Sequence, residues 1–110
     1  MKPEEAAQAI RDKAPAYGEA KAQRVYLEEF RKSKKAMLMK TALADQRAKS
    51  AAAAEMEAYA DVEYVELLKG IAAATEAAEG LRWGLVAAQA RVDVWRSINA
   101  SNRMMDKAVM

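Results

Sequence analysis

The stretch DVEYVELLKGIAAATEAAEGLRWGLVAAQARVDVWRSIN, residues 61–99, has the most regular pattern in this chain of 110 residues. Mostly apolar or small side chains recur at alternating steps of three and four, at Tyr64, Leu67, Ile71, Ala74, Ala78, Leu81, Leu85, Ala88, Val92, Trp95 and Asn99. This alternation keeps side chains on one side of an α-helix and is typical of helices that pack at a shallow angle. We call these positions the heptad seam and predict a long helix over residues 61–100.

A second apolar stripe lies on another face of the same predicted helix. It consists of Trp83, Ala87, Ala90 and Val94. A helix that is apolar on two faces needs two neighbours. Gly80 and Gly84 are four residues apart and would let a neighbouring backbone come close, although glycine weakens a helix by about 1 kcal/mol relative to alanine.

The rest of the chain is also predicted to be helical, in a single domain. It has 27 Ala, only four Gly and only two Pro residues, and Ala is the best helix former. Pro15 predicts a break in the helix, and Asp61 is a good N-cap. We therefore expect a short N-terminal helix at 1–14, a long basic helix at 15–49, an Ala-rich helix or hinge at 50–60, the heptad helix at 61–100 and a frayed tail at 101–110.

The predicted fold class is all-α, with long antiparallel helices in a helical hairpin or bundle and coiled-coil-like packing. Aromatic residues make up only 6% of the chain, and much of its 53% apolar content is Ala, which buries little area. Hydrophobic stabilisation scales with buried apolar area, so a monomer would gain little of it. We expect a homo-oligomer whose interface uses Leu67, Ile71, Leu81, Trp83, Leu85, Val92 and Trp95.

The composition argues against an enzyme. The chain has neither Cys nor His, which removes thiol nucleophiles, imidazole bases and the usual zinc sites. Paired acids such as Glu63 and Glu66 are interpreted as helix-surface residues, and a Gly-rich phosphate loop is not present. We expect no catalytic residue, no metal and no cofactor. With neither an apparent signal peptide nor an apolar run of 18 residues, the protein is expected in the cytoplasm, without contact with a membrane.

Charge is segregated along the chain although the net charge is only +2. Residues 31–49 sum to +6 and residues 50–80 to −6. Clustered Lys and Arg are typical of phosphate-backbone binding, and the candidate nucleic-acid site is Arg31, Lys32, Lys34, Lys35, Lys40, Arg47 and Lys49. The alternative is that the basic block pairs with the acidic block, within the chain or between subunits.

Two tryptophans raise the same choice between binding and packing. Trp83 and Trp95 could stack on exposed bases beside Arg82, Arg91 and Arg96. Packing in a core or an interface is the stronger interpretation for both, above all for Trp95 in the heptad seam.

The order of segments resembles a known family. A short leading helix precedes a long basic helix with Lys34-Lys35-Ala36-Met37-Leu38, and a less regular middle precedes a long helix that ends in Trp95-Arg96-Ser97. In length, layout and position of the basic block the chain is similar to the UvsY-type recombination mediators of T4-like phages. The Ala-rich run 51–54 departs from that family, which is more polar there.

The resemblance implies a phage-encoded helical protein that forms ring oligomers in the host cytoplasm and binds single-stranded DNA. Such mediators help to load a RecA-like recombinase onto DNA coated with single-strand-binding protein. By this resemblance the DNA contacts would include Lys40, Arg47 and Lys49, with Lys34 and Lys35 earlier on the helix.

Two hypotheses follow from the sequence. The leading one is a non-catalytic DNA recombination or replication accessory protein that binds single-stranded DNA. The alternative is a coiled-coil adaptor, scaffold or small inhibitor of a host protein that binds no DNA. One continuous exposed basic face would favour DNA, whereas pairing of the basic residues with Glu55 to Glu66 would favour the adaptor.

Overall fold

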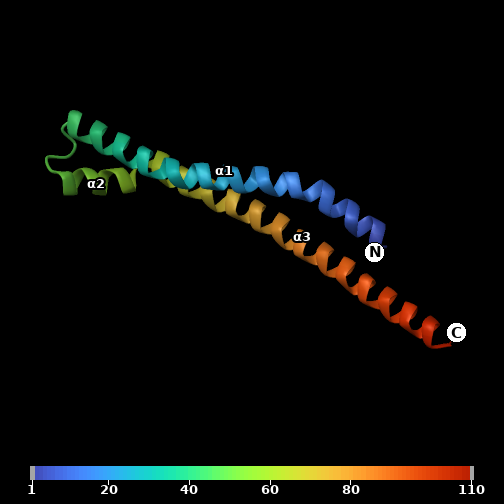
Figure 1. Cartoon of the computed structure of the whole chain (residues 1–110). Helices are drawn as coiled ribbons and strands as arrows, with labels where there is room; N and C mark the ends of the chain where they lie inside the picture. Colours follow the sequence, from blue (N-terminus) through green and yellow to red (C-terminus); the bar gives the residue numbers. More distant parts are fainter. Residues whose placement is uncertain (1, 110) are drawn as a thin grey trace. The chain divides into compact units, whose positions relative to one another are not determined.

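The structure is a computed structural model that describes residues 2–109 and consists of three α-helices: α1 (Pro3–Ala44), α2 (Ala51–Ala60) and α3 (Val62–Val109) (Figure 1). The predicted all-α class is confirmed, and it follows from the Ala-rich composition. Positions 1 and 110, at the ends of the predicted first helix and tail, lie outside the described residues.

The predicted break at Pro15 is wrong, because α1 continues through this residue to Ala44. An internal proline has no N–H to donate to the carbonyl group four residues earlier, which costs about 3 kcal/mol. Helix-forming residues such as Ala14 and Ala16 flank Pro15, and the many remaining backbone hydrogen bonds of a 42-residue helix offset this local loss.

The predicted helix 15–49 also ends five residues early, in a capped turn. Gln46 has a φ of 61°, in the left-handed region. The N–H of Arg47 donates to the carbonyl of Ala42 at 3.0 Å, and the N–H of Gln46 donates to that of Leu43 at 3.2 Å. These are the two hydrogen bonds of a Schellman cap, with glutamine where glycine is usual.

The open question about residues 50–60 is resolved in favour of a helix. The Ser50 side chain caps α2 by accepting a hydrogen bond from the Ala53 N–H at 3.1 Å. Asp61 then ends α2 and begins α3, since its Oδ1 accepts from the Glu63 N–H at 2.8 Å. The predicted N-cap at Asp61 is thereby confirmed.

The predicted frayed tail is wrong within the described residues, because α3 remains helical to Val109. Every residue from Ala100 to Val109 is nevertheless exposed. These last turns therefore rest on their own backbone hydrogen bonds.

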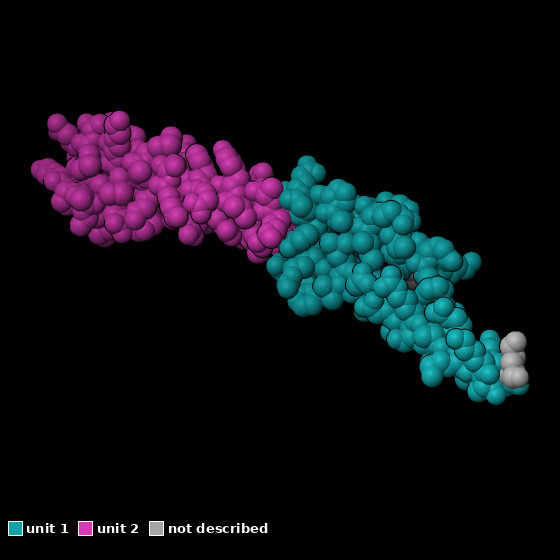
Figure 2. All heavy atoms as spheres, viewed as in Figure 1, with its two compact units in different colours: residues 1–19, 79–110 teal, residues 20–78 magenta. Residues whose placement is uncertain are grey.

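The chain divides into two compact units, which are described separately (Figure 2). Unit 2 is Ala20–Ala78 and contains the end of α1, all of α2 and the start of α3. Six of its buried residues form two clusters: Leu38 with Ala58 and Tyr64, and Ala42 with Ala48 and Ala54, with Met39 packed against both. Ala78 is also buried but belongs to neither cluster. Unit 2 is therefore held by contacts among three helices and the turn between α1 and α2.

Unit 1 is Met1–Glu19 with Glu79–Met110 and pairs the start of α1 with the end of α3. Its buried residues are Ala6 and Ala88. A Cβ added at Gly84 would lie 3.0 Å from Lys13 Nζ, whereas nothing lies within 4 Å of one added at Gly80. Of the two glycines predicted to allow a close neighbour, only Gly84 has one. That neighbour is the Lys13 side chain rather than the backbone of another helix.

The heptad seam is the inward side of α3 in both units. Tyr64, Ala78 and Ala88 are buried, while the half-buried members of the proposed oligomer interface are Leu67, Ile71, Leu81, Leu85 and Val92. Within each unit α1 runs antiparallel beside α3 (Figure 1), so α1 of the same chain is the partner helix of the seam. Trp95 departs from this pattern: it is 46% exposed.

Candidate functional site

The seven predicted DNA-contacting residues all belong to unit 2 but do not share one face. Five of them, from Arg31 to Lys40, lie on α1, whereas Arg47 and Lys49 lie in the turn that precedes α2. Arg31 and Lys40 are nine residues apart, which places them about half a turn from each other around a helix of 3.6 residues per turn. The five basic residues on α1 therefore lie around the helix rather than on one side of it.

Three of the seven cations pair with the acidic block on neighbouring helices. Lys34 Nζ lies 3.3 Å from Glu63 Oε2 on α3, and Lys35 Nζ lies 3.5 Å from Glu55 Oε2 on α2. Arg47 contacts both Glu57 Oε2 and Asp45 Oδ2 at 3.7 Å. Each of these three cations therefore has a carboxylate partner within the chain.

Lys35 has the most elaborate surroundings of the three. Its ammonium nitrogen lies 4.8 Å from the centroid of the Tyr59 ring, and Tyr59 packs edge-on against Tyr64 with ring centroids 5.3 Å apart. A hydrogen bond to the Tyr59 side chain, and secondarily the Glu55 charge, raise the pKa of Lys35 above its ordinary value. A raised lysine pKa favours the folded state at neutral pH and stops doing so only as pH rises through that pKa.

The other four cations remain exposed. Lys32 pairs with Glu29 of the same helix at 3.3 Å. Arg31, Lys40 and Lys49 make no ion pair with any of the described residues 2–109. An external anion would therefore find only these few exposed cations, which do not lie on one face.

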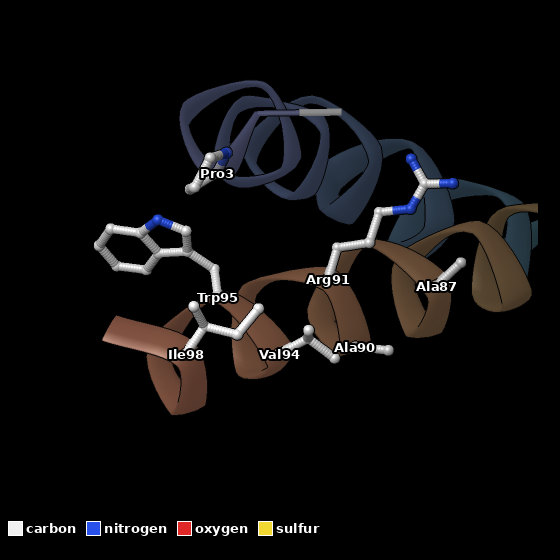
Figure 3. A pocket seen from close by; sticks show the side chains of 7 residues that line it. All are labelled: Pro3, Ala87, Ala90, Arg91, Val94, Trp95 and Ile98. Atoms are coloured by element: carbon white, nitrogen blue, oxygen red, sulfur yellow. The ribbon is translucent and has the colours of Figure 1, made fainter. Parts of the chain in front are cut away.

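Unit 1 contains an open apolar groove of about 580 Å³ that the sequence did not predict as a site. Its lining is Pro3, Ala87, Ala90, Arg91, Val94, Trp95 and Ile98. Figure 3 shows the Trp95 indole turned toward Pro3 and the Arg91 side chain extended toward α1. The groove is thus a hydrophobic channel with one cationic group at its edge.

The second tryptophan stands away from this groove. Trp83 is 59% exposed, and the guanidinium carbon of Arg82 lies 5.0 Å from its ring centroid. The predicted packing of Trp83 is therefore not made within the chain. Its exposed ring and adjacent cation suit either a base or an apolar partner surface.

Residues 2–109 contain no group of three or more acidic, His or Cys side chains that could hold a metal ion. Over the same residues, no helix combines the length and the apolar character that a membrane span requires.

Comparisons with known proteins add no assignment. The sequence matches no protein-family model, no curated protein and no solved structure. The resemblance to recombination mediators therefore stays a prediction.

Proposed function

We propose that this chain is a non-catalytic protein-interaction module, an adaptor, scaffold or small inhibitor that acts through its helix surfaces. The observation that carries the proposal is the pairing of Lys34, Lys35 and Arg47 with Glu63, Glu55 and Glu57. The interaction hypothesis expects such internal pairing, whereas a DNA-binding face would leave these cations free.

The distribution of apolar side chains supports the same proposal. No large side chain among residues 2–109 is completely buried, and seven of the nine buried residues are Ala. Large apolar side chains are instead exposed along unit 2, among them Tyr26, Met37, Val65 and Leu68. Val65 and Leu68, three residues apart in α3, are neighbours on the helix surface, and contiguous exposed apolar side chains are typical of sites that bind other proteins.

A second candidate function is the binding of single-stranded DNA, as in the phage recombination mediators that the chain resembles. The exposed positions of Arg31, Lys40 and Lys49 favour it, as does the segment order. In this proposal the protein contacts phosphates through these residues together with Lys32, self-associates and assists a RecA-like recombinase. Surface ion pairs are worth only about 0–1 kcal/mol, so phosphates could also displace the carboxylates from Lys34, Lys35 and Arg47.

Fluorescence anisotropy with a labelled oligo-dT at two salt concentrations separates the two candidates. The interaction module is expected to leave the anisotropy unchanged even at low salt. Binding that weakens steeply with salt would instead support the DNA candidate, because cations that neutralise phosphates release counterions.

Two matched triple variants locate any DNA site. Arg31→Gln/Lys40→Gln/Lys49→Gln removes cations that are unpaired among the described residues, and Lys34→Gln/Lys35→Gln/Arg47→Gln removes paired ones. Preferential loss of affinity in the first variant would place DNA on the exposed cations. If DNA is not bound, capture of partners on immobilised wild-type protein and on Val65→Glu/Leu68→Glu is the next step, and a specific partner must be lost with the variant.

A further inference from the structure

The exposed face of α3 in unit 1 repeats every eleven residues. Trp83, Val94 and Met105 are spaced by eleven, as are Ala87, Ile98 and Val109, and all six are exposed. Eleven residues make three turns of 3.67 residues, so each set of three lies close to a straight line along the helix. The two lines are about 40° apart around the helix axis and together form one stripe. We call these six residues the exposed stripe; it extends the stripe at Trp83, Ala87, Ala90 and Val94 by about four turns.

The exposed stripe has an apolar groove in its middle, from Ala87 to Ile98, and uncovered apolar side chains at its C-terminal end. The groove lies over Ala87, Ala90, Val94 and Ile98 and is bounded by Trp95 and Pro3 (Figure 3). Met105 is 66% and Val109 is 88% exposed, in the turns from Ala100 onward in which every described residue is exposed. These turns continue an existing helix, but their apolar side chains have no cover within the described chain.

We propose that the exposed stripe binds the same stripe of a second copy of this chain, antiparallel, so that the end of each α3 fills the groove of the other. The inference gives the proposed interaction function its partner: a copy of the chain itself. It shares Trp83 with the predicted oligomer interface but not that interface's seam residues from Leu67 to Val92, which lie on the side of α3 that faces α1.

Charge fixes the register of this pair. Arg91 lies at the edge of the groove, and Asp106 lies on the same flank of the exposed stripe, fifteen residues later. Around a two-fold axis perpendicular to an antiparallel helix pair, each flank faces the same flank of the other copy. Neither residue has an ion-pair partner among residues 2–109, so Arg91 of each copy can pair with Asp106 of the other.

The same register fills the groove. Residues that lie opposite each other then have numbers that sum to 197, so Met105 of one copy lies level with residue 92 of the other, between Ala90 and Val94. Val109 lies level with residue 88, beside Ala87. The two most exposed apolar side chains of the stripe thereby enter the groove, and Ile98 lies next to the two-fold axis.

A parallel pair is the competing arrangement. It would place Trp83 against Trp83 and would turn the groove toward the opposite flank, where Asp93 accepts a hydrogen bond from Gln89 at 2.9 Å. The groove would then face polar groups, whereas Met105 and Val109 would remain outside it. The antiparallel pair covers both the groove and the exposed side chains of Met105 and Val109.

Mass measured by light scattering or sedimentation, on the full chain over a range of concentrations, tests the self-association. We expect a concentration-dependent dimer whose dissociation constant rises at least tenfold in Met105→Asp. Met56→Asp is the matched control, since Met56 is 74% exposed on α2 in the other unit, and it should dimerise like the wild type. Circular dichroism should show unchanged helix content in both variants. A wild type that stays monomeric, or equal effects of the two variants, would overturn the proposal.

Single cysteines decide the orientation, because the chain has no Cys of its own. Under mild oxidation Ile98→Cys should form a disulfide-linked dimer, as its counterpart lies one residue away along the helix. Val94→Cys should not, because residue 103 lies opposite and the two cysteines would be about 13.5 Å apart along the axis, beyond the reach of a disulfide. Efficient linkage of both variants would show a parallel pair and refute the antiparallel one. Neither result depends on DNA binding, so this inference and the choice between the two candidate functions fail independently.

Discussion

Unit 2 and unit 1 are built from the same two long helices yet are stabilised differently. In unit 2 a third helix, α2, adds two buried clusters and ion pairs that join α1 to α2 and α3. In the described part of unit 1 the buried residues are the small Ala6 and Ala88, and the larger seam side chains Leu81, Leu85 and Val92 are only half-buried. The buried clusters therefore form in the unit to which the short helix α2 contributes.

The difference shows that in this Ala-rich hairpin one unit supplies most of the buried core and the other leaves apolar side chains exposed. Alanine lets helices approach closely but removes little apolar area from water, and stabilisation follows that area. Unit 2 compensates with Leu38 and Tyr64, whereas unit 1 leaves Val94, Ile98 and Met105 exposed. Stability is thus expected to come mainly from unit 2, and self-association through the exposed stripe from unit 1.

The largest expected effect is the loss of the unit 2 core. Leu38 is 8% exposed and packs with Ala58 and Tyr64, so Leu38→Ala should lower the free energy of unfolding by about 2–3 kcal/mol, the lower part of the range for buried leucine. Ile98→Ala in unit 1 is the control and should cost less than about 0.5 kcal/mol, measured by urea denaturation at a concentration where the protein is monomeric. Equal costs would mean that the two units do not differ in the proposed way.

A smaller effect is expected where α1 ends in unit 2. Gln46 adopts a φ of 61°, and a left-handed conformation costs a residue with a Cβ about 1–2 kcal/mol. Gln46→Gly should therefore raise the free energy of unfolding by up to about 1 kcal/mol, as seen in the urea midpoint. Gln23→Gly, within α1, should lower it by a similar amount. Destabilisation by both variants would show that the capped turn is not formed.

The glycines of α3 give a comparison of about the same size within unit 1. Gly80→Ala should stabilise the helix by up to about 1 kcal/mol, because nothing lies within 4 Å of the added Cβ. Gly84→Ala should gain less, since its Cβ would lie 3.0 Å from Lys13 Nζ and this side chain must move. Thermal unfolding of both variants measures the difference, and an equal gain would place Lys13 away from Gly84.

The sequence predicted the helices better than their partners. Periodicity located α3 and its inward face, and Asp61 marked its start, because both signals are local. Pro15 misled, since a local breaker competes with the cooperativity of a 42-residue helix. The end at Ala44 was missed because glutamine, rather than glycine, adopts the left-handed cap.

The candidate site was less predictable, because it depends on which segments face each other. The alternation of a basic and an acidic block in the sequence left internal pairing and a free face equally open. Only the hairpin, with α2 folded back, brings Lys35 to Tyr59 and Glu55. The groove at Pro3 and Trp95 joins residues from opposite parts of the chain, although the spacing of Trp83, Val94 and Met105 was a signal that could have identified the exposed stripe.

The smallest expected effect is the coupling of Lys34 to Glu63 in unit 2. A double-mutant cycle with Lys34→Ala and Glu63→Ala should give a coupling free energy of about 0.5 kcal/mol that decreases with salt, because Glu63 is exposed and such pairs are screened. The pair Lys69–Glu66, at 3.2 Å within α3, is the control and should give about 0.2–0.5 kcal/mol. A coupling near zero for Lys34 and Glu63 at low salt would mean that the carboxylate does not occupy this cation. Lys34 would then be free for phosphates, and the DNA candidate would become the stronger of the two functions.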